Sequence, residues 1–346
     1  MGSAILAPMR AGQCPEFDDL QRIVESGRGH LEVRDLCQVA VGGRQFPVRA
    51  IALGNASRDV PAIGLFGGVH GLERIGTRVV LAFLGSIVAR LAWDEQLHRQ
   101  LESLRLVFLP IVNPAGLWQG TRANASGVDL MRNAPVRAKE RVPFLYGGQR
   151  LSPRLPWYRG REGAAMEPEA EALCALVREE LLDRPFSLSL DCHSGFGLDD
   201  RIWFPFAHTR EPIAHLPEVH ALMTLFDHAY PNHDYIFEPQ SRQYFTHGDL
   251  WDHLYLECGP GRVFLPLTLE MGSWRWIRKS PSQLLSRAGI FNPLAAHRHQ
   301  RVLRRHLVWL EFLCRATASF RHWMPAGAKR DRHGREALAA WPAPTR

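Results

Sequence analysis

The stretch that decides the fold is PAIGLFGGVHGLE, residues 61–73. It starts as a short apolar run and ends in glycines and polar side chains, which is the pattern of a buried strand that stops at a sheet edge. Over 72–93, apolar residues then recur at every fourth position, which is the spacing of a buried helical face. A buried strand followed by an amphipathic helix predicts an α/β fold.

Further along the chain, four more apolar runs predict strands of the same sheet. They are LRLVFLPIVNP (104–114), FSLSLDCHSG (186–195), RIWFPF (201–206) and VFLPLTLEMG (263–272). Helical patterns lie over 167–182, 215–228 and 293–320, and an antiparallel strand pair is predicted over 36–42 and 47–53. Because strands and helices alternate, we expect a mixed, mainly parallel sheet that is covered on both faces. Its site should lie where the strands stop.

The chain has no internal repeat and no Ser/Gly-rich linker, so we expect one folded domain over 1–324. Within it, 1–35 form a helical lead-in. Residues 134–166, rich in Pro, Gly and Arg, predict a long surface loop. The stretch 325–346 predicts a flexible tail.

Composition narrows the class of protein. With 346 residues, 46% hydrophobic and 22% charged, the chain is neither disordered nor of low complexity. The net charge of +7 is modest for this length and does not indicate a nucleic-acid partner. The longest strongly apolar stretch, 79–89, is too short to span a membrane, and the N-terminal residues do not resemble a secretory signal. Six scattered cysteines without a CxxC pair are typical of reduced thiols, so we expect a cytoplasmic protein.

Three polar side chains at predicted strand ends could hold a metal. His70 and Glu73 form an HxxE pair directly after the first strand, and such a pair on a tight turn can reach one zinc ion. The chain holds three other HxxE pairs, beginning at His208, His215 and His333, which chance and helix-surface pairing explain. His193 also ends a strand. Two histidines and one carboxylate would leave zinc a position for water, as in catalytic sites.

Glu270 lies inside the apolar run LPLTLEMG, where an unpaired buried carboxylate is costly. It is a candidate catalytic base, and a salt bridge to a nearby arginine is the structural alternative. For His193 the structural alternative is a hydrogen-bonded residue at a strand end. The residues alone leave these alternatives open.

In order, the motifs HGLE, NPAG, GVDLMRN, the EPE helix start, DCHSG, the 244–252 stretch and TLEMG resemble those of zinc carboxypeptidases of the carboxypeptidase A type. The resemblance spans roughly 60–274. It implies a single α/β/α domain around a twisted, mixed, mainly parallel eight-stranded sheet. It also implies one catalytic zinc per chain and hydrolysis beside a free C-terminal carboxylate.

Carried over residue by residue, the resemblance makes His70, Glu73 and His193 the zinc ligands. Glu270 would be the general base that deprotonates water and later protonates the leaving amine. Asp129 would hydrogen-bond the first zinc histidine and fix its tautomer. An ordinary turn aspartate after a glycine is the alternative for Asp129.

The resemblance also assigns the substrate contacts. Arg132 would receive the terminal carboxylate through its two-pronged guanidinium, and Tyr244 would close over the terminal residue. Met131 stands where the family has an asparagine, so one carboxylate donor is missing. The arginine that stabilises the oxyanion is either absent, with Gln119 in its place, or supplied by Arg122. We favour Arg122, because a cation near the metal helps to hold an oxyanion.

Two further features lie outside this motif set. Asp249 and Trp251 are candidates for the floor of the specificity pocket, and they conflict, since Asp249 suits a basic side chain and Trp251 a smaller or apolar one. The helix AAHRHQRVLRRHLVW, 295–309, concentrates basic residues. A solvated helix face is the ordinary explanation, and a surface for an anionic partner is the alternative.

The sequence thus predicts a zinc metallocarboxypeptidase whose substrate is a peptide or an N-acyl amino acid with a free carboxylate, with neither a membrane nor nucleic acid as partner. An aspartoacylase-like deacylase of N-acyl amino acids and a non-catalytic peptide-binding relative are the alternatives. The preferred terminal residue and the oligomeric state cannot be deduced from the sequence.

Overall fold

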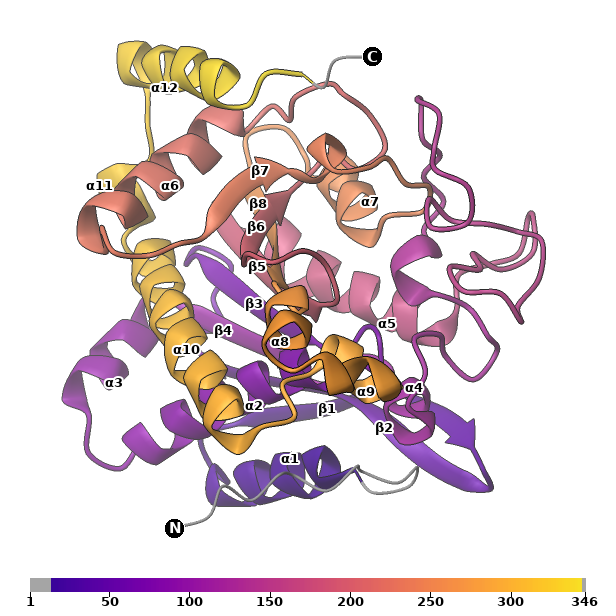
Figure 1. Cartoon of the computed structure of the whole chain (residues 1–346). Coiled ribbons are helices and arrows are strands. Elements are labelled where there is room, and N and C mark those ends of the chain that lie inside the picture. The colour runs from indigo at the N-terminus through magenta and orange to yellow at the C-terminus, as the bar shows by residue number, and fades with distance from the viewer. Residues whose placement is uncertain (1–13, 344–346) are drawn as a thin grey trace.

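A single eight-stranded mixed sheet forms the centre of the molecule. The computed structural model describes residues 14–343, and its strands run in the order β1-β2-β4-β3-β5-β8-β6-β7 (Figure 1). The strands are β1 (Glu32–Val41), β2 (Arg44–Gly54), β3 (Ala62–Gly67), β4 (Arg105–Leu109), β5 (Phe186–Ser194), β6 (Arg201–Phe204), β7 (Ile236–Pro239) and β8 (Val263–Met271).

The middle of the sheet is parallel. β4, β3, β5 and β8 run in one direction. β2 runs antiparallel to its two neighbours, β1 and β4, and β6 runs antiparallel to β8. Every residue of β3, β4 and β5 is buried, which explains why these strands appear in the sequence as continuous apolar runs. The predicted α/β fold and mixed sheet are confirmed.

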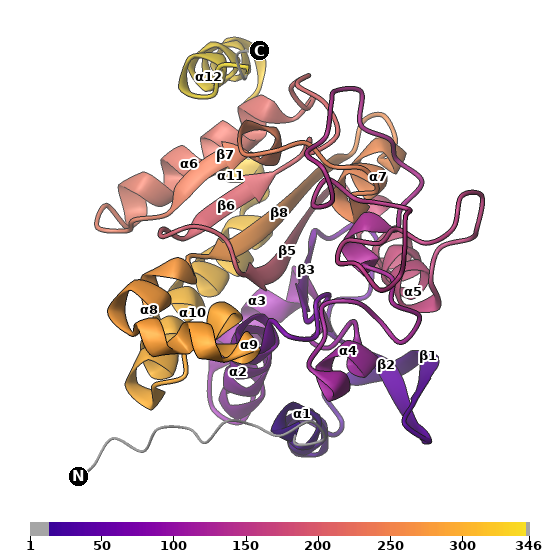
Figure 2. The ribbon, with the colours of Figure 1, turned by 45° about the vertical axis from the view of Figure 1, so that its right-hand side comes forward.

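Helices cover both faces of the sheet (Figures 1 and 2). On one face lie α2 (Arg74–Arg90) and α10 (Ala296–Ala318), which pack on β3 and β5, with α6 (Leu216–Ala229) beside α10. The Phe226 and Trp309 rings, 4.6 Å apart, join α6 to α10. On the other face lie α5 (Pro168–Val177), continued by a π-helical turn over 178–182, and α7 (Leu250–Glu257).

Helix α1 (Pro15–Ser26) lies within the predicted helical lead-in. Several other elements do not follow from the sequence pattern, and most of them have only one or two turns, which give no readable periodicity. They are α3 (Glu95–Glu102), α4 (Pro114–Gln119), α8 (Trp274–Lys279), α9 (Arg287–Phe291), α11 (Phe320–Trp323) and the longer α12 (Gly327–Ala340). Residues 134–166, all of which are described, form the predicted loop without any of these helices or strands.

The predicted flexible tail over 325–346 is wrong for much of its length, because 327–340 form α12, which packs on α6. Its polar sequence gives no amphipathic signal, and tertiary contacts hold it in place. The Nε of Arg330 donates to Glu218 over 2.6 Å, and the indole of Trp341 donates to the carbonyl of Phe237 over 2.7 Å. Within 14–343, no single helix is long and apolar enough to cross a bilayer. α2 and α3 pass such a test only together, bent by 109°.

A buried ion-pair network joins the sheet edge to its covering helix. Arg105 on β4 is 3% exposed and pairs with Glu32 of β1 at 2.6 Å and with Glu180 of the π-helical turn at 3.2 Å. Glu180 also lies 3.2 Å from Arg34 and 3.5 Å from Arg184. Because Glu180 is buried, these charges are screened little by solvent.

We therefore expect Glu180→Gln to lower the free energy of unfolding by about 1.5–3 kcal/mol, since a buried guanidinium loses a charged acceptor. The matched control is Glu179→Gln. Its carboxylate is half exposed and pairs with Arg34 at the surface, so its loss should cost less than about 1 kcal/mol. Urea unfolding followed by circular dichroism measures both. Equal effects of the two substitutions would contradict the assignment.

Candidate metal centre and substrate cleft

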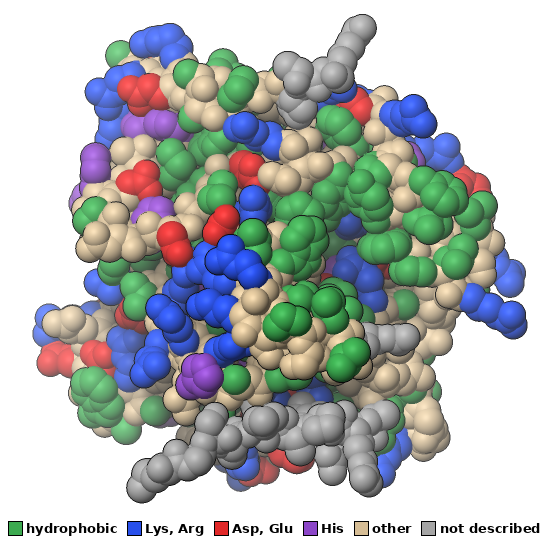
Figure 3. Space-filling view, in the orientation of Figure 1, with side chains coloured by type: hydrophobic (Ala, Val, Ile, Leu, Met, Phe, Trp, Pro, Cys, Tyr) green, Lys and Arg blue, Asp and Glu red, His purple; other side chains and the backbone are tan. Residues whose placement is uncertain are grey.

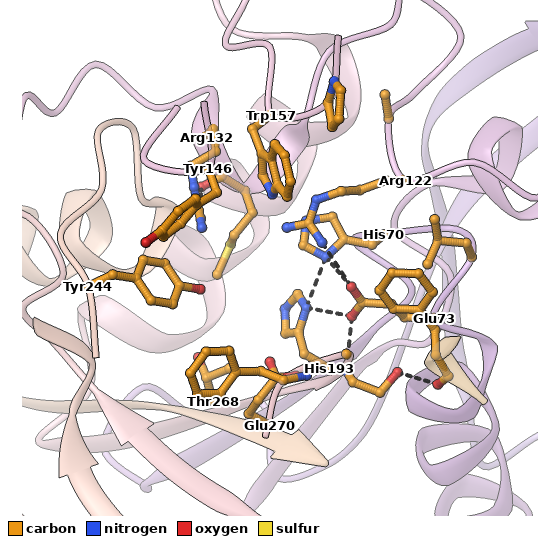
Figure 4. Close-up of a pocket in the computed structure, with 18 of the residues that line it drawn as sticks. His70, Glu73, Arg122, Arg132, Tyr146, Trp157, His193, Tyr244, Thr268 and Glu270 are labelled. Atoms are coloured by element: carbon orange, nitrogen blue, oxygen red, sulfur yellow. Dashed lines mark hydrogen bonds and ion pairs between the residues drawn. The ribbon is translucent and has the colours of Figure 1, made fainter. Parts of the chain in front are cut away.

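A cleft of about 860 Å³ opens where β3, β5 and β8 end. Figure 3 shows it as a hollow rimmed by apolar side chains, and Figure 4 shows the polar groups inside it. Such a crevice at the carboxyl ends of parallel strands is the usual place for a site in an open α/β sheet. Seven of the eight predicted site residues line this cleft, and only Asp129 does not. The cleft is lined by His70, Glu73, Arg122, Arg132, His193, Tyr244 and Glu270.

The turn from β3 to α2 carries His70 and Glu73. It is closed by a hydrogen bond from the backbone N–H of Glu73 to the carbonyl of His70 at 3.0 Å. Glycines let it pack tightly: a Cβ at position 71 would lie 1.9 Å from the carbonyl carbon of Gly116, and one at position 76 would lie 2.0 Å from the carbonyl oxygen of Cys192. These close approaches bring the turn against the end of β5, where His193 lies.

The three predicted ligands converge. His70 Nδ1 lies 2.9 Å from one carboxylate oxygen of Glu73, and His193 Nδ1 lies 3.1 Å from the other. The two Nδ1 atoms are 3.2 Å apart (Figure 4). All three side chains are buried, and their ligand atoms lie within 4.8 Å of one another.

Each histidine is held from behind by an aspartate. Asp129 Oδ1 lies 3.0 Å from His70 Nε2, which is the contact that the resemblance predicts, and Asp191 Oδ2 lies 2.7 Å from His193 Nε2. The indole of Trp251 donates to the same Asp191 oxygen at 3.0 Å. The sequence analysis missed Asp191. Its signal was the DxH spacing within a strand, which puts Asp191 and His193 on one face.

This donor set fits zinc. Each Nε2 faces an aspartate that can accept its proton, which leaves the two Nδ1 atoms to act as acceptors. The two Nδ1 atoms and the Glu73 carboxylate then form a group of acceptors around one point, and such a group suits a cation. Two imidazole nitrogens and a carboxylate oxygen are ligands that zinc prefers in catalytic sites.

Charge is concentrated in these buried groups. Burial alone raises the pKa of Glu73, but the adjacent His70 and His193 lower it well below its usual range. Burial likewise opposes a charged His193, yet Asp191 and Glu73 raise the pKa of this imidazole well above its usual range. A metal ion therefore competes with a proton at His193 Nδ1, so zinc affinity rises with pH.

Arg122 enters the cleft beside this cluster. Its Nε donates to Asp129 at 2.8 Å and its Nη1 to Glu73 at 3.1 Å. Burial alone lowers the pKa of Arg122, but Asp129 and Glu73 raise it, so this group keeps its charge. Gln119, the alternative position, is exposed at the end of α4 and is not among the residues that line the cleft.

Glu270 faces the cluster from the neighbouring strand. In the parallel pairing of β5 and β8, Glu270 is opposite His193, so the two side chains lie on one face of the sheet. The backbone N–H of Phe196 donates to Glu270 Oε1 at 3.0 Å. Burial and the neighbouring charge of Glu73 raise the pKa of Glu270 to about 8. A dication at the ligands would counteract this rise.

Arg132 lies on the opposite side of the cleft from Glu270 (Figure 4). It is 3% exposed, yet within 14–343 it forms no ion pair. Its Nη1 donates to the carbonyl of Met131 at 3.4 Å, and its Nε has no hydrogen-bond acceptor among the described residues. Met131 is buried and lines the cleft with its thioether.

Tyr244 belongs to an aromatic wall of the cleft. Its ring lies 5.5 Å from Tyr146, 5.9 Å from Phe196 and 6.0 Å from Trp203. Burial raises the pKa of Tyr244, so its hydroxyl stays protonated and can donate. Trp157, at φ +62°, continues this wall from the 134–166 loop. The cleft thus joins an apolar wall to a small number of charged groups.

The prediction that Asp249 and Trp251 floor the pocket is wrong, because neither lines the cleft. Asp249 caps α7 by accepting from the backbone N–H of Trp251 and of Asp252, both at 3.0 Å. Trp251 packs on Phe66 and supports Asp191. Both Asp249 and Trp251 therefore face the core. The cleft is lined instead by Met131, Trp203, Gln240, Gln243 and Thr268.

The basic side chains of α10 are partly buried and partly exposed. His306 is buried and Arg305 pairs with Asp200 at 3.0 Å, whereas His297, Arg301 and Arg304 are exposed. Lys and Arg side chains gather over α8 and α10 in Figure 3. This agrees with a largely solvated face.

Known proteins resemble this chain in sequence and in fold. The sequence profile of zinc carboxypeptidases matches residues 30–258. The chain is 33% identical over 105 residues to a probable carboxypeptidase 2 of Arthroderma benhamiae, over 29% of this chain and 19% of that protein. It is 26% identical over 202 residues to carboxypeptidase E of Caenorhabditis elegans, over 53% of this chain and 38% of that protein. The chain therefore spans less than half the length of these relatives.

Solved structures agree in fold. The chain matches thrombin-activatable fibrinolysis inhibitor with a TM-score of 0.66 at 17% identity, over 92% of this chain and 79% of that one. It matches carboxypeptidase A of Helicoverpa armigera with a TM-score of 0.61 at 16% identity, over 87% and 71%. At these identities the likeness is one of fold. The profile, by contrast, covers most of the chain and includes all three residues of the metal cluster, so this chain belongs to the zinc carboxypeptidase family.

Proposed function

We propose that this protein is a zinc-dependent carboxypeptidase that hydrolyses the peptide or amide bond next to a free terminal carboxylate. The proposal rests on the family and on one observation, the buried and unpaired guanidinium of Arg132 in the cleft. The carboxylates of Asp129 and Asp249 interact with Arg132 only from beyond ion-pair distance. Burying a cation without a direct ion-pair partner is costly, so the site calls for an anionic ligand. A carboxylate matches the planar, two-pronged donor geometry of arginine.

The neighbouring residues suit this reaction. His70, Glu73 and His193 would hold zinc, which supplies an activated water and polarises the scissile carbonyl. Glu270, which faces the ligands from β8, takes a proton from the attacking water and returns it to the leaving amine. Arg122 directs fixed positive charge at the place where an oxyanion develops. Tyr244 covers the terminal residue with a ring and a hydroxyl.

An aspartoacylase-like deacylase is the alternative within the same chemistry, since an N-acyl amino acid also carries a free carboxylate. The aromatic wall formed by Tyr146, Trp157 and Tyr244 favours the peptide substrate, because it offers apolar surface beyond the scissile bond. A non-catalytic peptide-binding role is disfavoured by the presence of the three ligands together with Glu270. Assays with free and blocked dipeptides and with N-acyl amino acids distinguish these possibilities.

The first prediction from this site concerns zinc. His193→Ala should remove one equivalent of zinc per chain, because an ion with two protein ligands left is bound far more weakly. His215→Ala is the control, since His215 accepts or donates a hydrogen bond with Tyr255 and lies outside the cluster. Elemental analysis of dialysed protein measures the metal. An unchanged zinc content in His193→Ala would contradict the ligand set.

A second prediction separates a catalytic from a structural Glu270. Glu270→Gln should keep the fold and the zinc and lower kcat by about 100-fold or more, because the proton transfer is lost. If Glu270 is only a structural acceptor for Phe196, the same change should lower the melting temperature and leave turnover per folded molecule intact. Rate, zinc content and melting temperature are measured on one preparation.

A third prediction tests recognition of the terminal carboxylate. Arg132→Ala should lower kcat/KM by a factor that corresponds to about 2–4 kcal/mol of transition-state free energy, the usual loss for a charged hydrogen-bonded partner. Arg132→Lys should recover only part of this, since an ammonium group cannot make the two-pronged contact. Met131→Asn should strengthen carboxylate binding by about 1 kcal/mol by adding a donor.

The matched control for Arg132 is the substrate itself. A peptide with an amidated C-terminus should be a poor substrate of the parent enzyme and should be no worse for Arg132→Ala. If the parent enzyme cleaves free and amidated peptides equally well, terminal-carboxylate recognition is wrong, whereas the metal and base assignments would still stand.

A further inference from the structure

A second cluster of metal-ligating side chains lies between α6 and α12, away from the cleft. His220 of α6 and His333 of α12 face each other, with their Nδ1 atoms 2.9 Å apart. Glu336, one turn after His333, places a carboxylate oxygen 4.0 Å from His220 Nδ1 and 3.9 Å from His333 Nδ1. The two imidazoles are buried, and the Glu336 side chain is half exposed.

The contacts of Glu336 are informative because none of them is a hydrogen bond. Its separations from both imidazoles and from Arg332 are 3.9–4.0 Å, beyond hydrogen-bond range. Two ligands of one zinc ion can be up to about 4 Å apart, and are about 3.3 Å apart in a tetrahedral site. The ligand atoms of the cleft cluster, at 2.9–3.2 Å, are as close as the two imidazoles here. An ion would draw Glu336 in by a few tenths of an ångström, and its exposed side chain is free to move.

Helix α12 depends on tertiary contacts with α6 for its stability. It has 14 residues, no side-chain cap at Ala326, and a glycine in its interior at position 334. A helix of this length is marginal by itself, and an interior glycine costs about 1 kcal/mol relative to alanine. Within α12, only His333 and Ala337 are buried, so the helix depends on contacts such as the Arg330–Glu218 pair and the buried Trp341 that follows it.

We propose that His220, His333 and Glu336 form a second, structural site for a zinc-class dication that fastens α12 to α6. Two imidazoles and a carboxylate select zinc, or cobalt as its spectroscopic substitute, over magnesium or calcium. Three protein ligands leave a position for water on the exposed side. This site is independent of the proposed hydrolysis, since its ligands are distinct from those of the cleft.

The decisive experiment measures metal per chain in proteins equilibrated with buffered free zinc. The full-length parent should hold two zinc ions, His193→Ala one, and His193→Ala/His333→Gln none. His333→Gln is chosen because a glutamine amide can still hydrogen-bond His220 while binding zinc poorly, so α12 can remain docked. The matched control is His228→Ala, an exposed histidine on the same α6, which should leave both ions in place.

A second readout follows α12 directly. In the His193→Ala background, zinc should slow amide hydrogen exchange of 327–340, and this protection should disappear with His333→Gln. Glu336→Ala removes an exposed ligand without disturbing the buried pair and should weaken zinc binding by roughly tenfold or more. No zinc in His193→Ala, or unchanged zinc protection in His193→Ala/His333→Gln, would overturn the proposal and leave His220 and His333 as a hydrogen-bonded pair only.

Discussion

The negative charge of Glu73, which is 2% exposed in the turn between β3 and α2, is the feature on which the rest of the structure depends. A carboxylate in that place is stable only if cations or donors surround it. The structure supplies His70, His193, the guanidinium of Arg122 and the backbone N–H of Ser194, which donates to Glu73 at 3.0 Å. These partners come from three separate stretches of the chain, so the charge can be accommodated only once the sheet has assembled.

A second layer of contacts keeps these partners in place. Asp129 orients His70 and Arg122 together, while Asp191 orients His193 and is itself held by Trp251 from α7. In this way α7, on the face of the sheet opposite α2, fixes His193 beside the N-terminus of α2. Glycines at positions 71 and 76 permit the close backbone approach that this requires. Rigid packing thus contributes to the chemistry, since a ligand set is useful only when its members cannot turn away.

Much of the fold and of the site could be predicted from the sequence, and the failures have physical causes. Apolar runs that end in HGLE, DCHSG and TLEMG located the strands and the polar residues after them, because burial on both faces leaves a continuous apolar signature. Asp249 and Trp251 were misplaced because spacing along the chain does not tell whether a side chain faces the cleft or the core. Helix α12 was taken for a tail because its contacts with α6 are polar and leave no hydrophobic periodicity.

What the sequence by itself determined was the type of the longer central strands and helices and the chemical identity of the cleft residues, since local periodicity and motif spacing are properties of neighbouring residues. Only the tertiary structure decided which groups meet. It paired Glu270 with His193 through the register of β5 and β8, put Asp191 behind His193, and brought Arg122 rather than Gln119 into the cleft. It also placed His220 against His333 across 113 residues of chain. Such contacts depend on how packed layers fit together, and that is decided by the burial of apolar surface over the whole chain at once.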